Sequence, residues 1–164
     1  MNLTDLYVKW IDYIERATSY ARNKIIIRHQ SVSSPQKPFI DIHITDIRRQ
    51  GTAIKKKLDS VNSIMTTTYA MTATLEVRSF ADSVTSSEAA LFSIIDTFDT
   101  QLQNDVFLSK IGYRGIVKEV MSLPMSLNNQ QESQSIFAVK FGFNHSVNEN
   151  LSWIETIDLT YNRI

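Results

Sequence analysis

The chain has 164 residues, 43% of them hydrophobic and 21% charged, which is enough apolar material to bury the core of a single domain spanning 1–164. Seventeen basic residues balance seventeen acidic ones, and this neutrality argues against a dedicated nucleic-acid binder, which needs an excess of Lys and Arg. The absence of cysteine excludes disulfides, thiolate catalysis and zinc sites of the cysteine type. No apolar run approaches the roughly 20 residues of a membrane helix, and the opening residues MNLTDLYVKW lack the pattern of a signal peptide, so we expect a soluble protein made in a cytoplasm.

The first predicted element is an amphipathic helix over residues 3–21. Its apolar side chains recur at spacings of three and four residues, and its charged side chains fall on the other faces. Asn2 or Thr4 is a plausible cap for its first turn. The β-branched run 25–27 then predicts a short strand, which ends at the loop SVSSPQKP.

Alternation with a period of two predicts the next strands. Residues 39–48 alternate isoleucine with polar side chains, and the residues that follow, Arg48–Gly51, suggest a hairpin turn. The segment 52–60 is compatible with a strand or a helical turn, of which we favour the strand. Residues 64–80 alternate apolar side chains with threonines and charged residues, which predicts a long, half-buried strand.

Capping signals and an apolar stripe predict a second helix. Thr85 and Glu88 have the spacing of a capping box, and Val84 with Ala89 has the spacing of a hydrophobic staple. The stripe of leucine, isoleucine and phenylalanine that follows extends the predicted helix to about residue 104.

The last third of the chain reads as a strand near 113–123, a polar loop at 126–134, and two regular strands at 136–143 and 153–161 that are joined across 144–151. Two helices and about six strands, mostly in hairpin order, predict an α+β fold: a largely antiparallel β-sheet with two main helices packed on one face. The other face and at least one edge of the sheet then stay open. Because an open edge pairs readily with another chain, this geometry favours oligomerisation.

Candidates for catalysis or metal binding are few. The three histidines fall in different predicted elements, and only Asp41 and His43 would share a strand face. A metal site or an acid–base pair there competes with the simpler interpretation of two polar residues on a solvated face or at a subunit contact. The four glycines form no phosphate-binding loop, and no serine sits in a nucleophile elbow. We therefore expect no enzyme, no cofactor and no metal.

One basic cluster stands out, made of Arg48, Arg49, Lys55, Lys56 and Lys57. Contact with DNA phosphates is one interpretation. The other, which we favour, is a solvated hairpin whose charges block wrong pairing at a strand edge.

The order of these segments resembles the tail-terminator (neck terminator) proteins of long-tailed bacteriophages. After an N-terminal helix come the proline-led strand PFIDIHI, the strand TATLEVRSFAD and the helix SSEAALFSIIDTF, which follows directly. The segments IGYRGI and SLP, a polar loop, and the pair IFAVKFGFNHS and WIETIDLTY complete the pattern. In that family the polar loop usually leads into an Arg, whereas this chain has Glu132, Ser133 and Gln134 there.

The resemblance implies a structural virion protein of the tail or neck, assembled in the host cytoplasm. Such proteins form homohexameric rings that cap the tail tube, end its polymerisation and provide the surface to which the head attaches. The implied partners are other copies of the chain, the tail tube protein, a head-completion or connector protein, and the tail sheath protein if the tail is contractile. DNA would pass through the lumen without sequence-specific binding, and no membrane is involved.

A ring needs two different patches on each subunit. We expect the basic hairpin and one strand face to contribute to subunit or tail-tube contacts, namely Arg48, Arg49, Lys55, Lys56, Lys57, Thr72, Thr74, Glu76 and Arg78. The alternatives are another head–tail connector or tail-completion protein of the same structural class, and a small-molecule binder or enzyme that uses the concave sheet face as a pocket.

Overall fold

The computed structural model describes residues 2–28, 35–98, 111–127 and 130–151. Two α-helices are present there, α1 (Leu3–Thr18) and α2 (Val84–Ile95), and a short 3-10 helix, η1 (Arg22–Lys24), follows α1. The strands are β1 (Ile25–Ile27), β2 (Phe39–Asp59), β3 (Ile64–Ala81), β4 (Ile111–Leu127) and β5 (Gln130–Asn150).

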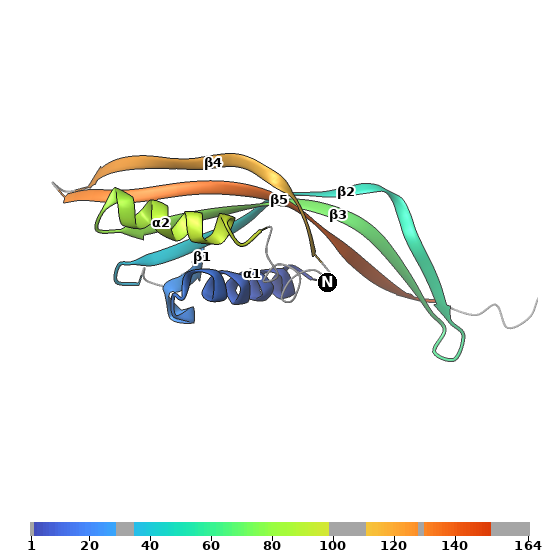
Figure 1. Cartoon of the computed structure of the whole chain (residues 1–164). Helices are drawn as coiled ribbons and strands as arrows, with labels where there is room; N and C mark the ends of the chain where they lie inside the picture. The colour runs from blue at the N-terminus through green and yellow to red at the C-terminus, as the bar shows by residue number, and fades with distance from the viewer. Residues whose placement is uncertain (1, 29–34, 99–110, 128–129, 152–164) are drawn as a thin grey trace, which may run out of the picture.

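The described strands form one sheet in the order β1-β2-β3-β5-β4. The short β1 runs parallel to β2, and every other pair is antiparallel. Both helices lie on the same face of this sheet (Figure 1). The predicted α+β class, with a largely antiparallel sheet and two helices on one face, is confirmed with five strands in the described residues. The predicted strand 153–161 lies outside them.

The core lies between the helices and the sheet face that they cover. The alternation of β5 places Phe137, Val139 and Phe141 on this face, where all three are fully buried. Trp10 of α1 meets Phe141 edge to face, with 5.2 Å between ring centroids. Tyr13 stacks on Phe98 at 6.0 Å. These aromatic contacts join α1 to the middle of β5 and to Phe98, in the segment that follows α2.

The helix ends follow from their caps. Asn2 caps α1, and its side chain and that of Asp5 each accept from the other's backbone N–H, which confirms the Asn2 alternative. The helix ends at Thr18, three residues before the predicted end, because Ser19 adopts a left-handed conformation. In α2 the predicted cap was wrong: the hydroxyl of Ser83, not Thr85, accepts from the N–H of Ser86.

The helix α2 ends at Ile95, with Asp96 as its C-terminal cap. The prediction extended this helix to about residue 104, and residues 99–104 lie outside the described part of the chain.

The hairpin turn predicted at 48–51 was wrong. Instead β2 continues to Asp59, and its pairing with β3 shifts in register after Thr45 and again after Arg49. Gly51, at φ +64°, supplies the backbone conformation that such an irregularity needs. The strand favoured for 52–60 is therefore confirmed through Asp59.

The polar loop predicted at 126–134 was also wrong, because β4 runs to Leu127 and β5 begins at Gln130. The strand predicted at 136–143 is longer at both ends and covers the supposed connection as far as Asn150. These extensions are polar. Backbone pairing with the neighbouring strands keeps them in the sheet, without the help of a buried apolar face.

The position of the core predicts that two Phe→Ala substitutions, one inside it and one outside it, differ in their effect on stability. Phe137→Ala should lower the free energy of unfolding by about 3–5 kcal/mol, because it empties a fully enclosed site. Phe92→Ala, on the outer side of α2 and 49% exposed, should change it by less than about 1 kcal/mol. Urea denaturation of dilute protein measures both, and equal losses would contradict this placement of the core.

Candidate interaction surface

The most prominent surface is a three-stranded extension that projects beyond the helices, which we call the arm. It consists of residues 46–59 of β2, 64–71 of β3 and 144–150 of β5. Figure 1 shows these strands curving away from the body that α1 and α2 cover. The strand β4 does not reach the arm, because its first residue, Ile111, pairs with Phe143. The arm therefore has solvent on both faces and at both edges among the described residues.

Polar cross-strand pairs hold the arm together in place of a core. Thr66 donates to the Asn148 side chain at 3.0 Å, and the hydroxyls of Thr68 and Ser146 lie 2.9 Å apart. The threonine-rich pattern of β3 thus forms a ladder with β5. Large apolar side chains nonetheless point into solvent along this extension, namely Ile47, Ile54, Leu58, Val61 and Val147. Apolar groups gathered on a projecting element indicate a contact surface for another molecule.

All five predicted basic residues lie on the β2 strand of the arm. Arg48 pairs with Asp46, with 2.6 Å between nitrogen and oxygen. The guanidinium of Arg49 lies 3.6 Å above the ring of Tyr69, a cation–π contact. Lys55, Lys56 and Lys57 are exposed farther along the same strand, opposite Thr68, Thr67 and Thr66. Lysines and register shifts along an outer strand are features that discourage uncontrolled strand pairing, and this role of the basic residues stays a prediction.

The tip of the arm is closed by Asp59. One of its carboxylate oxygens accepts from the backbone N–H groups of Val61 and Asn62, at 3.0 and 3.2 Å. The other oxygen accepts from the Asn62 side chain at 2.9 Å. These bonds, that from the Asn62 side chain first, lower the pKa of Asp59.

Glu76 and Arg78, predicted on a contact face, lie on the sheet face away from the helices and take part in an ion cluster within the protomer. Arg78 contacts Asp41 at 2.8 Å, and Arg28 contacts both Asp41, at 3.1 Å, and Glu76, at 2.7 Å. Asp41 is buried, whereas Glu76 is about one-third exposed. The cluster therefore fixes β1 to β2 and β3, and sequence reasoning missed the part of Arg28 and Asp41 in it.

The two predicted threonines lie nearby on β3. Thr72 is buried, and its hydroxyl accepts from the Gln50 side chain at 2.9 Å. Thr74 lies between Thr45 and Lys140 in the register of the sheet. The structure thus brings Thr72, Thr74, Glu76 and Arg78 together along β3 and places the basic residues on the arm. Their contact with another subunit stays a prediction.

The structure gives Asp41 other partners than the His43 of the metal or acid–base alternative. His43 lies opposite Glu76 in the register, and the carboxylate of Asp41 is held by two arginines. In the described part of the chain, no three His, Asp or Glu side chains gather where they could hold a metal ion.

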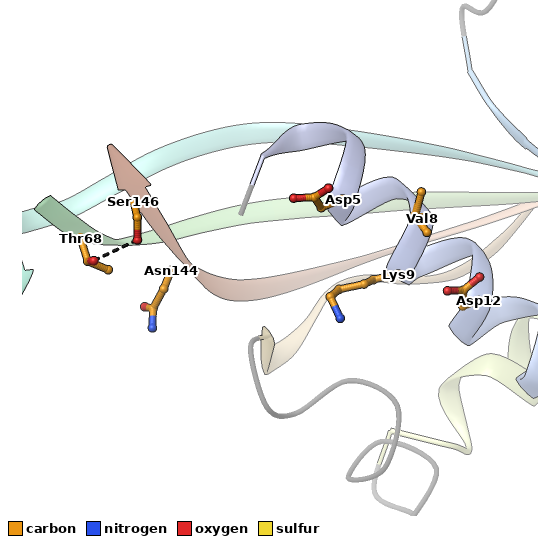
Figure 2. Close-up of a pocket in the computed structure, with 7 residues that line it drawn as sticks. All are labelled: Asp5, Val8, Lys9, Asp12, Thr68, Asn144 and Ser146. Carbon is orange, nitrogen blue, oxygen red and sulfur yellow. Dashed lines mark hydrogen bonds between the residues drawn. The ribbon is translucent and has the colours of Figure 1, made fainter. Parts of the chain in front are cut away.

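A groove of about 750 Å³ lies where the arm leaves the body. Figure 2 shows it between one side of α1 and the arm, with the lining residues Asp5, Val8, Lys9, Asp12, Thr68, Asn144 and Ser146. Its acidic groups already have structural roles, because Asp5 caps α1 and Asp12 pairs with Arg22. The groove is open, and its polar side chains hold no nucleophile next to a base, so it shows no evident chemistry.

The main features of the described fold are a projecting arm and a sheet that the helices cover incompletely. A family model described as phage neck terminator protein matches residues 2–164, and the chain belongs to this family. A search of curated proteins found no match. The chain is therefore a structural protein of the phage neck. Neither helix in the described residues has the length and hydropathy to cross a membrane.

The ion cluster predicts that Asp41→Asn destabilises the protomer by about 2 kcal/mol, less than for a fully buried pair because both guanidinium groups reach some water. The matched control is Asp46→Asn, which removes an exposed Arg–Asp pair and should cost less than about 1 kcal/mol. Thermal or urea unfolding compares them. Equal costs would mean that the cluster contributes no more than a surface pair.

The turn at Asp59 predicts a local pH dependence. Because its pKa in the folded protein lies below the unfolded value of about 3.9, the charged carboxylate stabilises the turn fully above that pH. This contribution is lost as the pH falls through the lowered pKa. The NMR signals of Val61 and Asn62 should shift over that range, whereas Asp59→Asn should abolish the transition. A transition that persists in the variant would assign it to another group.

Proposed function

We propose that this protein forms a homohexameric ring that caps the phage tail tube, ends its polymerisation and offers the attachment surface for the head. Its partners are then copies of itself, the tail tube protein, a head-completion or connector protein and, in a contractile tail, the sheath protein. The ring is assembled in the host cytoplasm and remains in the virion, with DNA passing through its lumen. The role is structural, without catalysis.

The arm is the observation that carries this proposal. It exposes apolar side chains and strand edges that the protomer itself does not cover, so it needs a second molecule to become buried. A closed ring supplies that molecule by placing each arm against a different patch of the next copy. Membership of the neck terminator family supports the same role.

The charge distribution supports a lumen that DNA can traverse. Five of the seventeen basic residues lie on the β2 strand of the arm, while the chain as a whole is neutral. A wall rich in lysine would bind phosphates and slow DNA, since each neutralised phosphate adds affinity. We therefore place the arms at subunit or tail-tube contacts and away from the lumen.

Native mass spectrometry and electron microscopy of the full chain test the ring directly. We expect a six-copy species and annular particles with a central hole. Added to growing tubes of the cognate tail tube protein, the ring should stop elongation and decorate one tube end. A stable monomer with no effect on tube growth would overturn the proposal. Rings that bind only head components would favour another head–tail connector.

A further inference from the structure

The outer side of α2 has the composition of a covered surface although nothing in the described protomer covers it. Among its 12 residues Glu88 is the only charged one, and that carboxylate accepts from the hydroxyl of Ser122 on β4. Its inner side is buried against the sheet. Its outer side exposes six residues without a charge, Val84, Thr85, Ser86, Ala89, Phe92 and Ser93, of which we call Val84, Ala89, Phe92 and Ser93 the α2 face.

An outer side that has no exposed charge and carries a large apolar side chain such as Phe92 is typical of a helix that is covered on that side as well. The other helix provides the contrast, because α1 carries exposed charged side chains, among them Asp5 and Arg16, and the partly exposed Lys9. The outer side of α1 is therefore suited to contact with water, and the outer side of α2 is suited to contact with another protein surface.

The charges around the α2 face indicate that its partner is a basic surface, and the arm of another copy has such a surface. The stretch 82–98 contains three acidic residues and no basic one, and its exposed acids, Asp82 and Asp96, flank the two ends of α2. The β2 strand of the arm, 46–59, carries five basic residues and two acidic ones. An apolar surface between acids on α2 is thus complementary to an apolar surface beside lysines on the arm.

The arm and the α2 face lie too far apart to meet within one protomer, so a contact between them joins two copies. Ser87 of α2 lies 2.7 Å from Ser135 on β5, whereas the arm portion of β5 begins nine residues later, at Asn144. Figure 1 shows α2 under one half of the sheet and the arm beyond the other. Residues 46–59 span up to roughly 45 Å as a strand, against about 18 Å for α2, so one arm can cross the whole helix of a neighbour.

We propose that the arm of each protomer packs across the α2 face of the next protomer. Ile54 and Leu58 then cover Phe92, and the neighbouring lysines approach the acids at the ends of α2. This inference rests on the proposed ring and names its two interface patches. Because the patches differ and lie at opposite ends of the protomer, each copy binds two neighbours, as a closed ring requires.

Two single-surface variants test the contact. Phe92→Asp disables the α2 face, and Leu58→Asp disables the arm; both replace exposed side chains. Val8→Asp, on α1 and 43% exposed, is the matched control outside the proposed contact. Circular dichroism and urea unfolding show whether each variant keeps the wild-type fold, and native mass spectrometry reports assembly.

We expect each of the two interface variants alone to lose the ring, and the Val8→Asp control to keep it. An equimolar mixture of the two should recover a one-to-one heterodimer and nothing larger. In that heterodimer the intact arm of the Phe92→Asp chain meets the intact α2 face of the Leu58→Asp chain. Rings that survive either substitution, or a mixture that stays monomeric while wild type forms rings, would overturn the contact and leave the ring itself standing.

Cysteine chemistry gives a readout that does not require a complete ring. The chain has no native cysteine, so Phe92→Cys and Leu58→Cys proteins mixed in equal amounts should be joined by a short bis-maleimide into heterodimers. Each protein alone should give few homodimers, because the two patches differ. Absence of the heterodimer would overturn the contact, and homodimers at either site would indicate a two-fold interface. If wild type forms no ring but the heterodimer is captured, only the hexamer proposal fails.

Discussion

Strand β3 pairs with β5 through all 18 of its residues without a shift in register, and this unbroken ladder dictates the rest of the architecture. At about 3.3 Å per residue the paired strands span roughly 59 Å, whereas the 16 residues of α1 span only about 24 Å. No arrangement of two such helices lengthwise under the sheet covers it fully. The arm is the part of the ladder that is left over, and its exposure follows directly from the mismatch in length.

Cross-strand hydrogen bonds keep the arm folded without a core, but the arm has little stability of its own. Its threonine and asparagine pairs satisfy side chains across the strands, and Asp59 closes the turn, yet three strands without a buried face gain little from the hydrophobic effect. An element of this kind can adjust to the surface on which it packs. The ion cluster around Asp41 has the opposite effect, because it fixes β1, β2 and β3 where the body must hold its shape.

Sequence patterns predicted the strands where one face is apolar, and they misplaced a turn at 48–51 and a loop at 126–134, where polar residues continue a strand. Arg48–Gly51 contains the residues of a turn, but the same residues serve a register irregularity within a continuing strand. From the sequence alone, Ser83 and Thr85 are equally good cap candidates, because the choice between them depends on where β3 ends. The partners of Arg28 lie 13 and 48 residues away, so only the register of the sheet brings them together. Sequence patterns did not single out the α2 face either, although a single charged residue among the 12 of this helix is a signal of it.

The formal charge of zero conceals a local separation of charge on which the proposed subunit contact depends. Basic residues gather on the arm and acidic ones on and around α2, at opposite ends of the protomer. A protein with a uniform net charge repels its own copies, and one with charges evenly mixed has no preferred orientation. Separated charges of opposite sign favour head-to-tail contact, because each contact brings the basic strand of one copy to the acidic region around α2 of the next. In the proposed ring these charges pair at the subunit contacts, which leaves little excess charge on the ring to retain DNA.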